Sequence, residues 1–221
     1  MEPAADTLAG RAAGLVQRDI LAGALPPGAR LAVHELAARY GIGVTPLREG
    51  LGRLVPLGLV AASGQRGFRV APVSRADLAD ITRARQAVEA AALRLSIAEG
   101  DAAWEAGIVG ALHLLRRQAG SVADPSVATA AFHAAHKQFH IALVAACGSP
   151  RLLRAQAALY DEAHRYRMVM MTRFEGWERF LRSHETLAEA VLSRAAEPAL
   201  ATLMAHLGST LVLVYGGGAA A

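Results

Sequence analysis

Several residue types and patterns are scarce in this 221-residue sequence, and each absence narrows its class. Cysteine occurs only at Cys147, which excludes an internal disulfide and every zinc motif built on cysteine pairs. Aromatic residues make up 5% of the chain, too few for a large β-sandwich. The first six residues lack an apolar signal core, and no uninterrupted apolar run approaches the roughly 18 residues that span a bilayer. We therefore expect a cytoplasmic protein that does not enter a membrane.

Lysine is also nearly missing, because Lys137 is the one lysine among 23 basic residues and the others are arginine. The net charge is +4 and the isoelectric point is about 9.8. Residues 1–73 carry eight arginines against five acids, whereas residues 74–221 carry fifteen bases against fourteen acids. The excess positive charge therefore lies mainly in the first third. It permits nucleic-acid binding there, although an arginine-rich composition with solvated charges explains it equally well.

The first third of the chain contains short helical segments separated by strong breaks. Residues 7–25 place leucine and isoleucine near a helical period, and Pro26-Pro27-Gly28 ends that segment. Residues 33–40 form a second short helix. Thr45-Pro46 is typical of a helix N-cap followed by proline at the first helical position, so we expect a third helix from there to about Leu57.

Two strand-like runs follow the third helix and indicate a β-hairpin. Residues 59–62 and 68–70 flank a turn that contains glycine, and three helices with a hairpin predict a winged helix–turn–helix. Ser74-Arg75-Ala76-Asp77 is similar to a capping box, and the chain beyond it is typical of about six helices. The predicted fold is mainly α, with a winged helix–turn–helix at residues 1–73, an all-helical bundle at residues 74–215 and a disordered tail at residues 216–221.

The expected helix–turn–helix places a small set of residues where DNA would lie. The second helix of this motif lies in the major groove, and its N-terminal residues meet base edges. Thr45 and Arg48 occupy those positions, and Arg48 can grip a guanine or a phosphate. The turn of the hairpin supplies Gln65, Arg66 and Gly67. Each feature alone is also typical of a solvated helix or a plain turn, but their combination favours DNA binding.

Histidines are the informative residues of the remaining chain. His136 and His140 are four apart on one expected helix, with His133 one turn before them, and His184 and His206 lie on two later helices. Two histidines at this spacing can share one metal ion, and histidines from neighbouring helices can complete the shell. Surface or hydrogen-bonded histidines are the alternative interpretation of the same spacing. We read the remaining three as structural: His34, His113 and His164.

A segment of about residues 9–74 resembles the DNA-binding domain of the GntR family. The shared pattern is Pro-Gly before an apolar residue, then Glu-Leu-Ala, Thr-Pro-Leu-Arg-Glu, Gly-Leu-Val and Arg-Gly-Phe-x-Val. Gly43 and Val44 stand where the family usually has serine and arginine, so no base contacts are carried over to them. Gly50, Gly52 and Pro56 lower the helix propensity, and we expect packing to order this helix.

Residues 75–213 resemble the all-helical FCD effector domain of the FadR subfamily. The metal pattern of that domain is an aspartate and a histidine four apart, then a histidine on each of two later helices. Phe139-His140, the Ser-His-Glu-Thr-Leu run at His184 and the His-Leu pair at His206 match this pattern, and His136 stands at the aspartate position. The resemblance implies a divalent transition metal bound by His136, His140, His184 and His206, zinc first, with nickel or iron as alternatives.

The same resemblance implies a small carboxylate effector that lies against the metal. Arg85, on the first helix of the domain, matches the arginine that assists it, and Glu89 lies one turn further on, at the spacing of an ion pair. Tyr166 and Arg167 are candidates for the far end of the ligand. Runs such as Trp104-Glu105-Ala106 and Ala146-Cys147-Gly148-Ser149 are similar to the carbon-starvation-induced regulators, which implies a C5 dicarboxylate effector.

Together these features predict a regulator and not an enzyme. We expect a homodimeric repressor that reads an inverted repeat in double-stranded DNA and changes its DNA affinity when the effector binds. Two alternatives stay open. A helical metalloenzyme is the first, although His34-Glu35 has Ala38 where a second histidine would complete a metalloprotease motif. A ligand-sensing scaffold without DNA binding is the second, which Gly43 and Val44 make conceivable.

Overall fold

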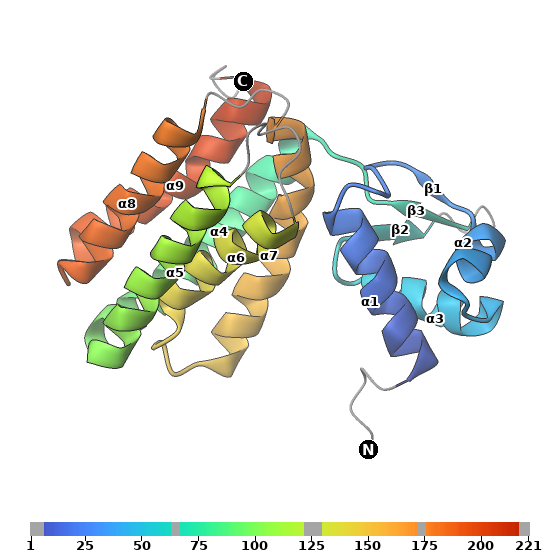
Figure 1. Ribbon diagram of the computed structural model, residues 1–221, viewed down its shortest axis with the longest axis horizontal. Coiled ribbons are helices and arrows are strands. Elements are labelled where there is room, and N and C mark those ends of the chain that lie inside the picture. Colours follow the sequence, from blue (N-terminus) through green and yellow to red (C-terminus); the bar gives the residue numbers. More distant parts are fainter. Residues whose placement is uncertain (1–6, 63–66, 122–129, 172–175, 217–221) are drawn as a thin grey trace. The chain divides into compact units, whose positions relative to one another are not determined.

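The chain forms two compact units, which are considered separately. The structure is a computed structural model that describes residues 7–62, 67–121, 130–171 and 176–216, with the backbone alone at 167–171. The first unit comprises Met1–Ser74 and the second Arg75–Ala221 (Figure 1). The tail predicted at residues 216–221 lies outside the described residues except for Gly216.

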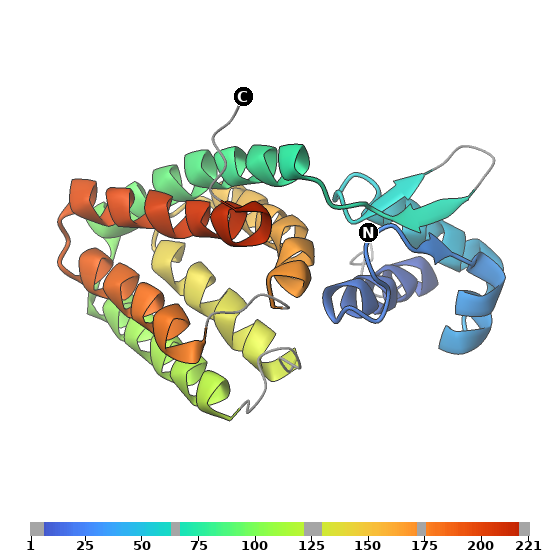
Figure 2. The ribbon, with the colours of Figure 1, turned by 90° about the horizontal axis from the view of Figure 1, so that it is seen from above.

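The first unit is a winged helix–turn–helix, as the sequence predicts. Its strands have the order β1-β3-β2, and both pairs are antiparallel. The second and third strands form the hairpin (Figure 2). The two-residue strand β1 was not expected, and it pairs Arg30 with Arg69 and Leu31 with Phe68. The elements are α1 (Leu8–Leu21), β1 (Arg30–Leu31), α2 (Val33–Tyr40), α3 (Val44–Leu54), β2 (Val60–Ala62) and β3 (Phe68–Val70).

Helix α3 begins two residues earlier than predicted. Its N-cap is Gly43, and Thr45 lies inside the first turn, so the prediction of Thr45 as the cap was wrong. Pro46 is the third helical residue, where the missing N–H has no intrahelical acceptor and costs nothing. Helix α2 ends at Gly41, whose φ of 62° is a left-handed conformation that glycine adopts without strain.

Helices α1 and α3 approach each other closely in the core of the first unit. A Cβ atom added at Gly50 would lie 2.8 Å from the backbone nitrogen of Ala13 and 2.8 Å from the carbonyl oxygen of Ala9. Glycine at this position therefore allows the backbones to meet. Leucine side chains of α3 fill the rest of this contact, and the fully buried ones are Leu47, Leu51 and Leu54. These contacts are consistent with the expectation that packing orders this helix.

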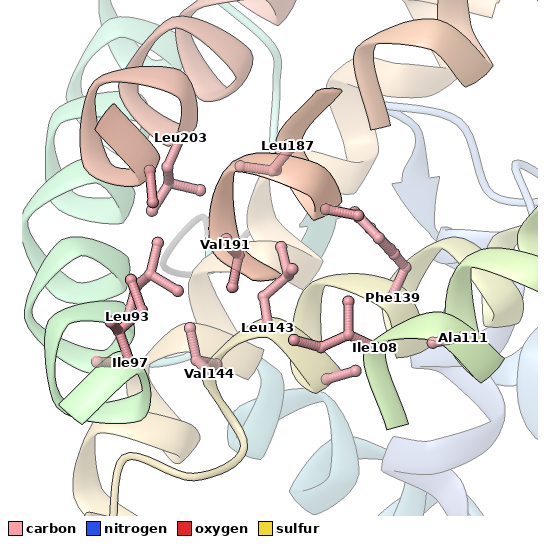
Figure 3. Close-up of a cluster of buried hydrophobic side chains, with 14 of the residues drawn as sticks. Leu93, Ile97, Ile108, Ala111, Phe139, Leu143, Val144, Leu187, Val191 and Leu203 are labelled. Atoms are coloured by element: carbon pink, nitrogen blue, oxygen red, sulfur yellow. The ribbon is translucent and has the colours of Figure 1, made fainter. Parts of the chain in front are cut away.

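The second unit is all-helical, as predicted. Its described residues form α4 (Arg75–Glu99), α5 (Ala102–Gly120), α6 (Ala130–Val144), α7 (Pro150–Met171), α8 (Trp177–Leu192) and α9 (Ala196–Tyr215). Helix α4 packs against α7 and α9, and α5 packs against α6 and α8. Figure 3 shows the shared core, in which Leu93, Ile108, Phe139 and Leu203 come from four different helices.

Two of the described connections of the second unit, α4–α5 and α8–α9, make polar contacts with helix ends. The carboxylate of Asp101 accepts a hydrogen bond from the backbone N–H of Trp104 at 2.9 Å and caps α5. The indole N–H of Trp104 donates to the carbonyl of Ala142 at 2.9 Å. Arg194, between α8 and α9, donates to the carbonyl oxygen of Gly100 at 2.7 Å. These bonds hold α4, α5, α6 and the α8–α9 connection together.

Helix α9 is the one described helix whose length and apolar composition would allow it to cross a membrane. A single helix of this kind is weak evidence, because the core helix of a soluble protein passes the same test. In this chain the helix packs against α4 and α8. Its buried side consists of Ala199, Leu200, Leu203, Leu207 and Val214.

Candidate metal and effector site

Three buried histidines from two helices meet in the second unit. Helix α6 supplies His136 and His140, whose spacing of four residues places both rings on one face, and α8 supplies His184. Nε2 of His136 lies 2.8 Å from Nε2 of His184 and 3.2 Å from Nε2 of His140. The three candidate ligand atoms all lie within 4.8 Å of one another. Three imidazole nitrogens in this arrangement could hold a metal ion.

Hydrogen bonds at the outer nitrogens orient two of these rings. Nδ1 of His184 lies 2.7 Å from the carbonyl oxygen of Phe180. A carbonyl only accepts, so this nitrogen carries the hydrogen, and in the neutral ring Nε2 presents its lone pair. Nδ1 of His136 lies 3.0 Å from the hydroxyl oxygen of Tyr160 on α7. Such partners fix the orientation of metal-binding histidines in proteins.

His206, on α9, lies beside this cluster. Its ring centre is 4.6 Å from that of His184 and 5.2 Å from that of His140. Its nitrogens are not part of the three-histidine group, so its role as a fourth ligand stays a prediction. His133 lies one turn before His136, and its ring contacts His164 of α7 at 4.6 Å between centres.

Aromatic rings line the cluster on the side of α8. The ring of Phe180 lies 4.1 Å from that of His184, and Phe132 stacks on His136 at 6.1 Å with an interplanar angle of 8°. Trp177 contacts Phe132 edge-on at 4.9 Å. This apolar wall lowers the local dielectric, which strengthens the attraction between a bound cation and an anionic ligand.

Arg85 is buried in α4 close to the same cluster. Its side chain pairs with Glu89, at 2.8 Å between Nε and Oε1, which confirms the ion pair that the spacing indicated. Its guanidinium carbon lies 5.5 Å from the ring centre of Tyr160, whose hydroxyl reaches His136. Its Nη2 atom is buried and has no hydrogen-bond partner among the described residues. A buried guanidinium nitrogen without an acceptor is costly, which favours a ligand oxygen there.

Of the two candidates for the far end of the effector, the structure describes the side chain of Tyr166 but not that of Arg167. Tyr166 is buried, and its hydroxyl donates to the carboxylate of Asp77 at 2.5 Å. Arg165 reaches the same carboxylate at 3.5 Å. These bonds tie the end of α7 to the start of α4. The side chain of Arg167 lies outside the described residues.

Tyr160 of α7 contacts this cluster, and Gln156 is buried one turn before it; neither was identified from the sequence. Tyr160 is flanked by two cations, with Arg85 at 5.5 Å and Lys137 at 5.8 Å from its ring centre. Gln156, one turn before Tyr160, is 1% exposed, and its Nε2 atom has no hydrogen-bond partner within the described chain. Neither residue stands in a motif, and the packing of α7 against α4 and α6 explains why this part of the helix is buried.

Three of the five candidate DNA-binding residues are among the described residues of the first unit: Thr45, Arg48 and Gly67. Thr45 and Arg48 are solvent-exposed on the first two turns of α3. Gly67, just before β3, has a φ of 87°, a left-handed conformation that suits a tight turn at the wing. Gln65 and Arg66 lie outside the described residues.

A winged helix joined to an all-helical unit is the architecture of a class of protein, the two-domain DNA-binding transcriptional regulator. Comparison with known families agrees. The model of "Bacterial regulatory proteins, gntR family" matches residues 8–70, and that of the "FCD domain" matches residues 80–209. The chain therefore belongs to the FCD-containing, FadR-like branch of the GntR family of bacterial regulators.

Individual relatives are consistent with this membership. The chain is 36% identical to the Escherichia coli (strain K12) "HTH-type transcriptional repressor GlaR", over 90% of this chain and 92% of that protein. It is 34% identical to the "Uncharacterized HTH-type transcriptional regulator BphR" of Paraburkholderia xenovorans (strain LB400), over 90% and 82%. The solved structure of E. coli McbR/YncC shares the fold, with a TM-score of 0.79, 21% identity and coverage of 95% and 97%. GlaR and BphR are named as transcriptional regulators, in line with a regulator and not an enzyme.

Proposed function

We propose that this protein is a transcriptional repressor whose affinity for DNA is changed by a small carboxylate bound at a metal ion. The convergence of the His136, His140 and His184 nitrogens carries the effector half of the proposal. The exposed first turns of α3, with Thr45 and Arg48, support the DNA half. The name of the repressor GlaR, similar over nine-tenths of both chains, supports the sign of regulation.

The donor set fits a divalent transition metal. Neutral imidazole nitrogens suit zinc, nickel and iron(II), and we propose zinc first. His206 is the proposed fourth ligand, because its ring lies against those of His140 and His184. When bound, the ion supplies positive charge that attracts a carboxylate. His136 at the position of a family aspartate leaves this shell without negative charge, which strengthens that attraction.

The effector is held by this chain through buried donors on α4 and α7. Arg85 offers Nη2 to a carboxylate oxygen, while Glu89 holds the guanidinium in place through Nε. Gln156 offers a second buried N–H group one turn before Tyr160. A ligand with oxygen atoms at both ends satisfies the metal and these donors together. A C5 dicarboxylate, which the similarity to carbon-starvation-induced regulators implies, has that form.

DNA binding is proposed for a homodimer that reads an inverted repeat in double-stranded DNA. Two copies related by a two-fold axis present two recognition helices, and such helices bind half-sites about one helical turn apart. Helix α4 follows the first unit directly in the chain and carries Arg85. In this proposal α4 takes two positions, and the dimer binds DNA well in only one of them. An effector that binds more tightly to one position therefore changes the fraction of dimers that are able to bind DNA.

The effector half is tested by metal analysis and calorimetry on the full chain. The purified protein should bind one zinc per chain, and the zinc-loaded protein should bind glutarate. His140→Ala should lose both. His113→Ala is the matched control, since His113 is exposed on α5. Zinc binding that survives His140→Ala would overturn the proposed metal site. No glutarate binding by the zinc-loaded wild type would overturn the proposed effector.

The DNA half is tested with fluorescence anisotropy on fragments of the chain's own promoter region. Arg48→Ala should weaken binding by about 1–3 kcal/mol, the value of a good arginine contact to DNA bases. Arg53→Ala, at the C-terminal end of the same helix, should change it much less. Equal affinities of wild type and Arg48→Ala would favour a sensing scaffold that does not bind DNA.

A further inference from the structure

Without a metal ion, the short contact between His136 and His184 requires a hydrogen on one of two facing nitrogens. Their Nε2 atoms are 2.8 Å apart, a hydrogen-bond distance. In the neutral ring of His184 the hydrogen is on Nδ1, because that atom faces the carbonyl of Phe180 at 2.7 Å. Nε2 of His184 is therefore the acceptor, and Nε2 of His136 is the donor.

This assignment determines the direction of the next hydrogen bond. With its hydrogen on Nε2, the neutral ring of His136 presents a lone pair at Nδ1. The hydroxyl of Tyr160, 3.0 Å away, must then donate to Nδ1. Without a metal ion, the donors then run from Tyr160 to His136 and from His136 to His184, and the hydrogen on Nε2 of His136 also faces Nε2 of His140, 3.2 Å away, as a second acceptor.

A metal ion among the three Nε2 atoms needs the opposite arrangement at His136. Each neutral imidazole binds a metal through a lone pair, so Nε2 of His136 must be free of hydrogen. The hydrogen is then on Nδ1, which donates to the oxygen of Tyr160. The change is neutral overall: one hydrogen leaves Nε2, one is added at Nδ1 by exchange with water, and the hydroxyl keeps its own hydrogen and rotates.

We propose that Tyr160 is a positioning residue that selects the metal-binding form of His136, and that metal binding reverses the hydrogen bond between them. The inference rests on the proposed metal site and adds to it a tautomer-dependent contact. An aspartate at position 136 would bind a metal through carboxylate oxygen atoms. It has no tautomers, so it would need no partner that selects one of them. The ring of Tyr160 also contacts Arg85, at 5.5 Å, so the reversal occurs beside the proposed effector arginine.

Tyr160→Phe tests the proposal with zinc or cobalt(II) alone as the probe. The variant keeps the ring and loses the oxygen, and competition with a chromophoric chelator should show metal binding weakened about 10- to 100-fold, as for other outer-shell partners of metal-bound histidines. Tyr40→Phe is the matched control, because it also removes a hydroxyl that donates a hydrogen bond, here to Asp19 at 2.8 Å, and it lies in the first unit. Its metal affinity should stay within about threefold of wild type, well short of an outer-shell effect.

A second measurement uses the wild-type protein and does not depend on a variant that folds. Nitrogen-15 correlation spectra of the imidazole rings distinguish the two neutral forms of His136. The hydrogen should be on Nε2 in metal-free protein and on Nδ1 after zinc is added. A hydrogen on Nδ1 in both states would overturn the reversal, and equal metal affinity of wild type and Tyr160→Phe would overturn the positioning role. Wild type that binds no zinc at all would instead overturn the metal site.

Discussion

A glycine-to-alanine substitution inside a helix combines a gain in helix propensity with the effect of packing a new Cβ atom. Gly50 and Gly52 of α3 allow the two effects to be separated. Gly50 lies in the middle of α3, where α1 passes closest, and an added Cβ would also meet the Cβ of Ala12 at 2.9 Å. Gly52, two residues further along α3, is exposed, and an added Cβ there has nothing within 4 Å. Alanine at the two positions therefore gains the same helix propensity but meets different surroundings.

The expected changes in unfolding free energy have opposite signs. Alanine is favoured over glycine inside a helix by about 0.5–1 kcal/mol. Overpacking of a tight contact costs about 1–3 kcal/mol, and two of the three atoms near Gly50 are backbone atoms that yield least. We expect Gly50→Ala to destabilise the first unit by about 1–2 kcal/mol. Gly52→Ala should stabilise it by about 0.5–1 kcal/mol.

Hydrogen exchange measured by mass spectrometry can read these changes in the first unit alone. Amides of α1 and α3 should exchange about 5- to 30-fold faster in Gly50→Ala, the factor that corresponds to one or two kcal/mol. In Gly52→Ala they should exchange about 2- to 5-fold more slowly. Slower exchange in Gly50→Ala, or equal changes in both variants, would refute the argument that backbone contact requires glycine at position 50.

Three further perturbations give expected results in both units. Asp101→Ala removes the cap of α5 and should cost the second unit about 1 kcal/mol in thermal unfolding. The pKa of Tyr40 is raised to about 12, first by burial and then by its hydrogen bond to Asp19. The folded unit therefore favours the protonated hydroxyl of Tyr40. The contribution of this group to the stability of the first unit is complete below pH 10 and is lost as the pH rises towards 12. If the proposed metal site is occupied, removal of the metal by a chelator should lower the melting temperature of the second unit, because a ligand of the folded form stabilises it.

Each of these results has a control. Asp80→Ala, an exposed carboxylate of α4, should leave thermal unfolding nearly unchanged, and an equal loss there would contradict the capping argument. Tyr40→Phe should remove the loss of stability between pH 10 and pH 12, and tyrosinate absorbance should lack the late ionisation. An unchanged pH profile in that variant would contradict the assignment. The chelator should have no effect on His140→Ala, and an equal shift there would show that it acts elsewhere.

The sequence predicts the architecture of the first unit better than its details. Glycine and proline punctuation together with apolar spacing identify three helices and a hairpin, because local residues determine these elements. Thr45 and Gly50 show what local reasoning misses. Thr45 has the chemistry of a cap, yet Gly43 takes that place. Gly50 and Gly52 have the same low propensity in the sequence, and only the approach of α1 distinguishes them.

The histidine cluster likewise combines a local feature that the sequence predicts with contacts between helices that it does not. The spacing of His136 and His140 on one helix is a local signal, and helix periodicity alone predicts that their rings share a face. His184 lies 48 residues from His136, so spacing offers it only as a histidine on a later helix, and the family pattern was needed to single it out. Tyr160 had no signal at all, because its contact with His136 depends on how α7 packs beside α6. Contacts between side chains of different helices are set by packing that no single segment encodes.

The position of Trp177 gives the protein an internal fluorescent reporter. Both tryptophans belong to the second unit, so intrinsic emission excited at the indole band comes from that unit alone. Trp177 contacts Phe132 and Phe180, and these rings in turn contact His136 and His184. A paramagnetic ion such as copper(II) or cobalt(II) at the cluster would quench this emission, whereas zinc would not. Loading of the cluster can therefore be followed in the unlabelled chain, even while it is bound to DNA.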